Sequence, residues 1–351
     1  MTTGSQPLVS IVSPVYNESE HLAECIESVL AQTYQNWDYT IVNNCSTDGS
    51  MEIARRYAAR DRRIRIHENQ QFLPVIQNHN VAFRQTSPNS KYCKVVLSDD
   101  WIFPECIERM VALAEEHPSV GIVSAYCLEG TRVMWAGLPY ERTVIPGREV
   151  CRRHLLEGLY LSGSATSVLY RADAVRSRNP FYNDAHIHAD TEVAFELLKA
   201  SDFGFVHQVL TFTRVRPGSL TTIASDRSSH YPGTLHILRI YGQDYLTVKE
   251  FEACMSGHMA QYYRFLGKSV LLGRDKEFWD YHKRQLAEAG VGFSRVRLTL
   301  AALENLCMAA LNPKGTLEKL LRHTGKRTVA IGPENRAPKP AAIPGQPGSV
   351  G

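Results

Sequence analysis

Short apolar runs alternate with amphipathic segments along the first 130 residues of the chain. The apolar runs predict strands at residues 8–15, 37–42, 64–67, 92–97 and 121–128. Between them, apolar residues recur at helical spacing, as Leu22, Ile26 and Val29 do, which predicts helices at 17–30, 51–58, 75–85 and 104–116. Strands that alternate with helices of this length indicate a parallel sheet with right-handed crossovers. The first half is therefore expected to be doubly wound α/β.

The second half has a weaker pattern. Between residues 129 and 160, Arg, Gly and Pro interrupt every periodic run. Strands are predicted at 164–170 and 204–215, with a helix at 191–200, and residues 230–325 are mostly helical in pattern. The last twenty residues contain five prolines and four glycines, which predicts disorder. We expect an α/β domain over 1–225 with halves at 1–128 and 129–225, a helical C-terminal extension at 226–330 and a disordered tail at 331–351.

Composition and charge limit the classes of function. The 351 residues are 44% hydrophobic and 21% charged, enough to bury a large core. Lys and Arg number 39 against 36 Asp and Glu, and the net charge of +3 argues against a dedicated nucleic-acid binder. The eight cysteines form no C-x-x-C spacing, so reduced thiols are expected. The first residues do not show the basic and then apolar pattern of a secretory signal peptide, and no apolar run is long enough to span a membrane. This predicts a cytoplasmic protein without a membrane span.

Two adjacent carboxylates, Asp99 and Asp100, end the apolar run at 92–97. The carboxyl end of a strand is where open α/β sheets place their ligands. Mg²⁺ or Mn²⁺ is commonly held by one or two such acids together with phosphate oxygens and water. The alternative is a pair of solvated loop acids, one of which caps the helix that begins near Pro104.

Three polar loops follow predicted parallel strands, at residues 14–18, 43–48 and 98–101. Because the carboxyl ends of parallel strands meet at one sheet edge, these loops are expected to converge. The Asn43 and Asn44 amides suit the edge of a nucleobase and Tyr16 offers a stacking face, although an Asx-turn and a core-edge aromatic are equally open alternatives. Neither G-x-G-x-x-G nor a P-loop is present, so bound phosphates would need a metal at the acidic pair.

Four ordered segments together resemble a known family. The sequences VSIVSPVYNE (9–18), CIESVLAQTY (25–34), NCSTDGS (44–50) and SDD (98–100) look like the family 2 glycosyltransferases of the GT-A fold. The resemblance extends over about residues 8–215 and is strongest in the first 115. It implies a GT-A-type, mostly parallel sheet with flanking helices. It also implies transfer of a sugar, with inversion and with Mg²⁺ or Mn²⁺, from a nucleoside diphosphate sugar to a hydroxyl acceptor in glycan or polysaccharide biosynthesis.

The resemblance also implies roles for individual residues. Asp99 would face the ribose or donor sugar and share the metal with Asp100, which would ligate the cation between the two phosphates. Arg214 and Arg216 stand at the end of the last predicted strand, where a guanidinium can fork onto diphosphate oxygens, although ordinary surface charge is the alternative. The residues implied for the nucleoside pocket are Pro14, Tyr16, Glu18 and Asn44.

Asp190 is the candidate catalytic base. It lies just before a predicted helix in the second half, where family members usually have a catalytic Asp. An acceptor hydroxyl is a poor nucleophile at neutral pH, so a carboxylate within hydrogen-bond reach should take its proton. The alternative role is an N-cap of that helix, and the two roles can coexist. Glu192, two residues further on, is the reserve candidate.

The sequence departs from the family at several of these positions. Leu97 stands where many relatives have a further Asp, so the metal site would rest on Asp99 and Asp100 alone. Many relatives carry Asp where this chain has Asn43 or Asn44, which leaves the base open although a UDP-sugar is the expected donor. His is common at the position of Arg216.

Other functional classes remain open. A catalytically silent nucleotide-binding relative that docks a partner is one, and a nucleotidyltransferase is another. The expected acceptor is a saccharide or a lipid-linked sugar. The amphipathic segment 295–311, followed by Lys314, Lys319, Arg322, Lys326 and Arg327, suits peripheral contact with an anionic membrane, and a packed helix with a solvated basic end is the alternative.

Overall fold

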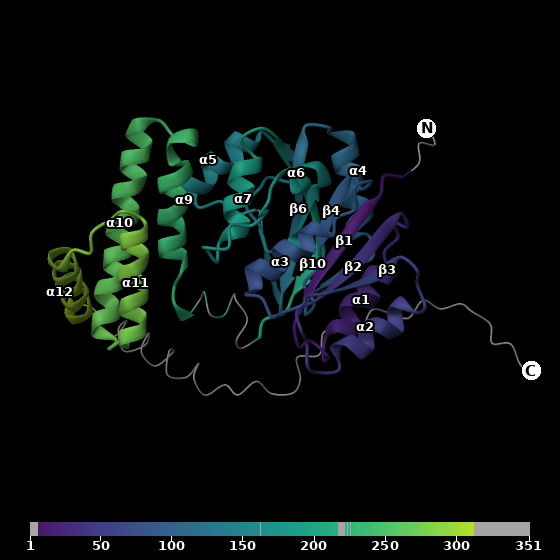
Figure 1. Ribbon diagram of the computed structural model, residues 1–351. Coiled ribbons are helices and arrows are strands. Elements are labelled where there is room, and N and C mark those ends of the chain that lie inside the picture. Colours follow the sequence, from purple (N-terminus) through teal and green to yellow (C-terminus); the bar gives the residue numbers. More distant parts are fainter. Residues whose placement is uncertain (1–5, 162, 217–221, 223, 225, 312–351) are drawn as a thin grey trace, which may run out of the picture. The chain divides into compact units, whose positions relative to one another are not determined.

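A mixed β-sheet organises the chain in the computed structural model, which describes residues 6–161, 163–216, 222, 224 and 226–311 (Figure 1). In this described part, the sheet has ten strands, eight of them in the order β3-β2-β1-β4-β9-β6-β10-β5, while β7 pairs with β6 and β8 with β10. The strands are β1 (Val9–Val15), β2 (Trp37–Asn43), β3 (Ile64–Glu68), β4 (Tyr92–Val95), β5 (Trp101–Ile102), β6 (Val120–Glu129), β7 (Arg132–Met134), β8 (Val144–Ile145), β9 (Val168–Arg171) and β10 (Asp202–Thr213).

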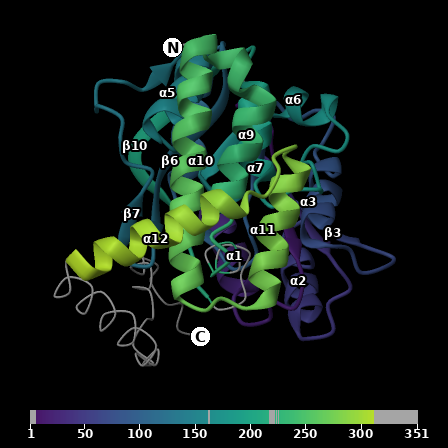
Figure 2. The ribbon, with the colours of Figure 1, turned by 90° about the vertical axis from the view of Figure 1, so that its left-hand side faces the viewer.

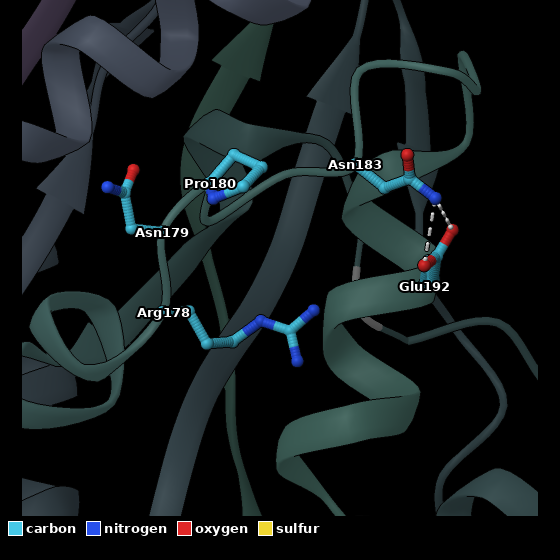
Figure 3. Close-up of a pocket in the computed structure, with 5 residues that line it drawn as sticks. All are labelled: Arg178, Asn179, Pro180, Asn183 and Glu192. Carbon is cyan, nitrogen blue, oxygen red and sulfur yellow. Dashed lines mark hydrogen bonds between the residues drawn. The ribbon is translucent and has the colours of Figure 1, made fainter.

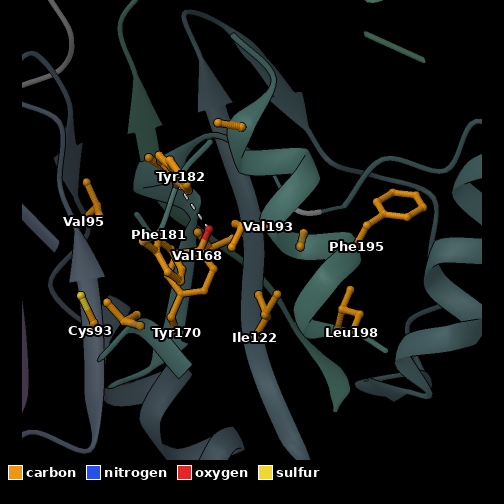
Figure 4. Close-up of a cluster of buried hydrophobic side chains, with 14 of the residues drawn as sticks. Cys93, Val95, Ile122, Val168, Tyr170, Phe181, Tyr182, Val193, Phe195 and Leu198 are labelled. Atoms are coloured by element: carbon orange, nitrogen blue, oxygen red, sulfur yellow. Dashed lines mark hydrogen bonds between the residues drawn. The ribbon is translucent and has the colours of Figure 1, made fainter. Parts of the chain in front are cut away.

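Helices cover both faces of the sheet. One face packs against α1 (Leu22–Leu30), α2 (Ser50–Ala58) and α4 (Cys106–Glu116), whose apolar sides join one buried cluster. The other face packs against α3 (Val75–Arg84), α5 (Gly147–Glu157), α6 (Ala172–Ser177) and α7 (Ala189–Leu197), and α9 (His230–Tyr245) packs on the outer side of α5 and α7. Figure 4 shows part of this second cluster. Its Tyr170, Phe181 and Tyr182 contact one another and Phe83 of α3. A sheet buried on both faces explains why its strands are continuous apolar runs.

The chain divides into two compact units. The first comprises residues up to Tyr262 together with Asp275–Phe293, and so includes the sheet, the first part of α10 (Val248–Leu271) and α11 (Lys276–Glu288). The second comprises Tyr263–Arg274 and the residues from Ser294 on, of which α12 (Arg295–Leu311) is described. None of the helices in the described ranges is both long enough and apolar enough to span a bilayer.

The predicted α/β fold is confirmed, with differences that long-range pairing explains. β1 is parallel to β2 and β4, and β2 to β3, as expected. The strand predicted at 164–170 is a 3₁₀ turn, η1 (Ala165–Ser167), followed by β9, which runs antiparallel to both β4 and β6. The short strands β5, β7 and β8 were not predicted, because two or three residues carry no periodicity. Helix α5 was not predicted because its arginines and Gly147 interrupt the apolar spacing.

Two helix starts also differ from the prediction. Helix α1 begins at Leu22 and not near residue 17, because Asn17 has a left-handed φ of 51° that turns the chain. Helix α4 begins at Cys106, so neither acid of the 99–100 pair caps it. The predicted disorder at 331–351 falls outside the described residues, and the predicted boundaries at 128, 225 and 330 stay predictions.

Candidate functional site

The loops after β1 and β2 are joined by hydrogen bonds at the carboxyl edge of the sheet. The backbone N–H of Glu18 donates to the Ser50 hydroxyl at 2.8 Å, and that of Ser19 donates to Asp48 Oδ2 at 2.9 Å. Burial raises the pKa of Asp48, but hydrogen bonds from Ser50 and Ser19 outweigh it and hold that pKa at about 2. The Asp48 carboxylate therefore fixes one loop against the other.

Asp100 is buried and accepts hydrogen bonds from three protein donors. Its Oδ2 accepts from the hydroxyls of Thr166 at 2.6 Å and Thr213 at 3.3 Å, and its Oδ1 accepts from the backbone N–H of Arg214 at 3.0 Å. Burial, followed by the adjacent Asp99 charge, raises the pKa of Asp100 to about 7. Asp100 thus ties the end of β4 to η1 and to β10.

Asp99 is more accessible and shares a guanidinium with Glu18. Arg216 donates from Nε to Asp99 Oδ2 at 2.7 Å and also binds the Glu18 carboxylate. Burial raises the pKa of Glu18, and the charge of Arg216 opposes that rise. We call Glu18, Asp99 and Asp100 the acidic edge. Its charge is offset by arginines that lie more than a hundred residues further along the chain.

Arg214 approaches the same edge from the end of β10. Its Nε donates to the backbone oxygen of Asp99 at 3.1 Å, and its guanidinium also binds the Glu24 carboxylate on α1. Both arginines predicted to meet a diphosphate therefore lie at the acidic edge, where in this structure their guanidinium groups bind protein oxygens.

Asn44 is placed at the predicted edge, but its amide is occupied. Its Oδ1 accepts from the Leu73 N–H at 2.9 Å and from Asn69 Nδ2 at 3.0 Å, and its Nδ2 donates to the Leu73 oxygen at 2.8 Å. Asn44 is also only 2% exposed. It therefore holds the 69–73 loop in place and does not present its amide to a ligand.

That loop carries an exposed aromatic partner for Tyr16. Phe72 and Tyr16 are 55% and 45% exposed, and their rings meet edge to face with centroids 4.8 Å apart. Pro14, by contrast, is buried in β1 beside Val42 of β2. Among the predicted pocket residues, Tyr16 therefore has the accessible ring, and Phe72, which was not predicted, accompanies it.

Asp190 lies in the first turn of α7, one residue after its start. Its Oδ1 accepts the backbone N–H of Thr191 at 2.7 Å. Burial raises the pKa of Asp190, and the hydrogen bond from Thr191 opposes that rise. A carboxylate with a raised pKa is a stronger base, which suits proton abstraction.

Glu192, the reserve base, is held by two partners. His236 Nε2 lies 3.0 Å from Glu192 Oε2, and Asn183 Nδ2 donates to both carboxylate oxygens at 3.1 and 3.2 Å. Burial raises the pKa of Glu192, but these hydrogen bonds leave that pKa below its usual value. Glu192 also lines a pocket of about 370 Å³ with Arg178, Asn179, Pro180 and Asn183 (Figure 3). Its lowered pKa makes it a weaker base than Asp190.

The segment 160–167, of which residue 162 is not described, connects the acidic edge with the first turn of α7, which carries Asp190. The Tyr160 hydroxyl lies 3.3 Å from the Thr191 hydroxyl, next to Asp190, and donates to the Gly163 oxygen. Thr166 of the same segment donates to Asp100. The candidate base and the acidic edge are thus joined through one short stretch of chain.

Three supporting residues were missed by the sequence reasoning. Thr166 and Thr213 have no local signal, since their contacts with Asp100 span 66 and 113 residues. Lys94 did have one, because a lysine interrupts an apolar strand. It is 0% exposed, and its Nζ donates to the backbone oxygens of Thr166 and Val168. Burial lowers the pKa of Lys94. Lys94 therefore holds η1, and with it Thr166, against β4.

The oxygen donors at the acidic edge fit a hard divalent cation only in part. In the described ranges, no three His, Cys, Asp or Glu side chains form a metal-binding group. Mg²⁺ needs only one or two protein carboxylates when phosphates and water complete its shell. The Asp99 side chain, which is 14% exposed, fits that requirement, whereas the buried Asp100 already accepts three hydrogen bonds.

The sequence comparisons give a consistent result. Residues 10–177 match the profile of the family described as "Glycosyl transferase family 2". The glycosyltransferase GlyG of Streptococcus pneumoniae is 31% identical over 119 residues, which cover 34% of this chain and 39% of GlyG. The chain matches only 35–42% of the length of such curated relatives.

Solved structures share the fold at low sequence identity. The S. aureus TarS structure in complex with UDP-GlcNAc has a TM-score of 0.61 at 15% identity and covers 84% of this chain and 87% of that one. The mannosyltransferase PcManGT from Pyrobaculum calidifontis, in complex with GDP-Man and Mn²⁺, has a TM-score of 0.51 at 14% identity, with 86% and 87% covered. The expected α/β sheet with flanking helices is therefore confirmed.

Proposed function

We propose that this chain, whose residues 10–177 match the profile of glycosyl transferase family 2, transfers a sugar from a nucleoside diphosphate sugar to a hydroxyl group of an acceptor. The proposed role is in glycan or polysaccharide biosynthesis, with a saccharide or a lipid-linked sugar as acceptor. The observation that carries the proposal is the acidic edge, where Glu18 and Asp99 share Arg216 beside the loops that follow β1 and β2. Such an edge suits a diphosphate and its cation.

The donor base is proposed to lie against Tyr16 and Phe72. Their exposed rings offer a stacking surface, and stacking tolerates any base. Since the Asn44 amide is occupied by the 69–73 loop, selection of the base falls to other groups of that loop. A UDP-sugar remains the expected donor, and the bound nucleotide in the TarS structure is consistent with it.

A bound Mg²⁺ or Mn²⁺ would offset the charge that develops on the leaving diphosphate. We propose that Asp99 ligates the cation directly and that Asp100, the other predicted ligand, mainly orients the turn that carries Asp99. The hydrogen bonds from Thr166 and Thr213 to Asp100 support this division. Arg214 and Arg216 would then release the protein oxygens that they bind and would donate hydrogen bonds to the donor's diphosphate instead.

Asp190 is proposed to act on the acceptor. Its carboxylate takes the proton of the attacking hydroxyl while the acceptor oxygen bonds to the anomeric carbon. The bond from that carbon to the diphosphate oxygen breaks in the same displacement, and its electron pair leaves with the diphosphate. One displacement opposite the leaving group inverts the anomeric configuration. The raised pKa of Asp190 supports this assignment.

The test is release of nucleoside diphosphate from a panel of UDP-, GDP- and TDP-sugars in the presence of Mn²⁺ and candidate saccharide acceptors. A donor that raises the melting temperature should also be turned over. Binding without turnover, and without any difference between wild type and Asp190→Asn, would instead identify a silent nucleotide-binding relative.

A further inference from the structure

Helix α12 presents an apolar stripe to solvent. Its residues Val296, Leu300, Leu303 and Leu311 are 70%, 62%, 52% and 81% exposed. Together with Cys307, they fall within about 120° of the helix circumference at 3.6 residues per turn. Figure 2 shows α12 lengthwise. Leu306 and Met308, on either side of the stripe, are also 54% and 62% exposed, which widens the apolar surface. An exposed apolar surface that extends along a whole helix marks a site of interaction with a protein or a membrane.

The opposite side of α12 already has a partner within its own compact unit. Ala301 is 6% exposed, and a Cβ at Gly267 of α10 would come within 2.5 Å of the Ala301 backbone, so the two helices touch there. Asn305 Nδ2 donates to the Arg264 backbone oxygen at 3.0 Å. The packed side and the apolar stripe therefore lie on opposite sides of the helix, and packing in this unit does not explain the stripe.

The charges beside the stripe are mainly positive. Arg295 and Arg297 flank it at the first turn, and Glu304 is paired with Arg264 at 3.3 Å. A surface with an apolar stripe and basic flanks matches an anionic lipid bilayer, whose headgroups attract the cations while the stripe enters the acyl boundary.

We propose that α12 lies in the surface of an anionic membrane, with Val296, Leu300, Leu303 and Leu311 inserted and with Arg295 and Arg297 at the headgroups. A second copy of the chain is a less favourable partner for the stripe. A dimer through the stripe would bring the basic flanks of the two copies together, and these like charges would repel each other. The inference is independent of the proposed transferase activity. It concerns where the protein is held and not what it does.

The test is co-sedimentation of the full chain with vesicles of phosphatidylcholine alone and of phosphatidylcholine mixed with phosphatidylglycerol. Partitioning should be at least about tenfold stronger on the anionic vesicles and should weaken as NaCl is added. The double variant Leu300→Glu, Leu303→Glu should lose about tenfold or more of this partitioning. Both positions are exposed, so the variant should keep the wild-type melting temperature.

Val248→Glu is the matched control, since Val248 is 74% exposed at the start of α10 and outside the stripe. It should partition like wild type. Failure of the wild-type chain to prefer anionic vesicles, or equal partitioning by the double variant, would overturn the proposal. A wild-type dimer in light scattering that becomes monomeric in the double variant would identify the second copy as the occupant.

Discussion

The carboxylates of the acidic edge and the Asp190 carboxylate in the first turn of α7 have different hydrogen-bond and ion-pair partners. At the acidic edge, Arg216 binds both Glu18 and Asp99, and Asp100 accepts three hydrogen bonds. On α7, Asp190 accepts from its neighbour Thr191, and burial raises its pKa. Burial raises the pKa of Glu18, Asp100 and Asp190 alike, so the two regions differ in the partners of their carboxylates and not in the direction of these shifts.

This difference assigns separate tasks to the two regions. Carboxylates that are paired with arginines suit the joint binding of a cation and a diphosphate. The cation takes the place of the arginines at the carboxylates, and the arginines bind the diphosphate, so the net charge of the site changes little. A carboxylate with a raised pKa suits removal of a proton during reaction. Changes at the two regions should therefore separate binding from turnover.

The largest expected effect is on turnover, from Asp190→Asn. The amide keeps the shape but cannot take a proton, so turnover should fall by about 10² or more while donor affinity stays near that of wild type. Steady-state kinetics and donor titration measure the two quantities. Glu192→Gln on the same helix is the control and should cost much less. Wild-type turnover in Asp190→Asn would remove Asp190 as the base.

The next effect is on donor binding, from Asp100→Ala. This change should weaken metal-dependent donor affinity by about tenfold and lower the free energy of unfolding by about 1–3 kcal/mol, because the Thr166 hydroxyl and the Arg214 N–H lose their acceptor. Calorimetric titration with and without chelator and urea unfolding measure these effects. Asp100→Asn should recover most of the stability. Donor affinity insensitive to both chelator and Asp100→Ala would sink the metal assignment.

A smaller effect is expected on cation binding, from Arg216→Ala. Removing the guanidinium from Glu18 and Asp99 should let Mn²⁺ bind about threefold more tightly, on the scale of one partly exposed ion pair. Electron paramagnetic resonance titration of free Mn²⁺ measures this change. Arg55→Ala, which breaks an exposed pair with Glu68 on α2 and β3, should leave Mn²⁺ binding unchanged. Weaker Mn²⁺ binding in Arg216→Ala would mean that the arginine organises the acids.

The smallest effect is on acid stability, from Asp48→Asn. Hydrogen bonds hold the folded pKa of Asp48 at about 2 against an ordinary value of 3.8, so its contribution is present above about pH 4 and is lost as pH falls toward 2. Asp48→Asn should therefore cost about 1 kcal/mol at neutral pH and about a third of that at about pH 2.5. Urea unfolding at both pH values checks it. An equal cost at both would show that charge on Asp48 is irrelevant.

The acidic edge could be predicted because its parts are local. Runs such as β1 and β2 carry their own apolar pattern, and parallel pairing brings the residues after them together. The roles within the edge could not be predicted. Nothing in the sequence indicates that the Asn44 amide is hydrogen-bonded to the 69–73 loop. The contact between Thr213 and Asp100 likewise has no local signal, because it spans 113 residues. The orientation of β9 likewise depends on its pairing with β4 and β6.

The position of β10 in the sheet bears on how such a domain can be exchanged between proteins. The segment that matches the family ends at residue 177, yet the chain just beyond β10 supplies both Arg214 and Arg216. The strand also pairs with β6 and is the partner of β5, directly after Asp100. A transplant cut at residue 177 would carry the acids without their cations, so the smallest exchangeable piece extends at least through residue 216.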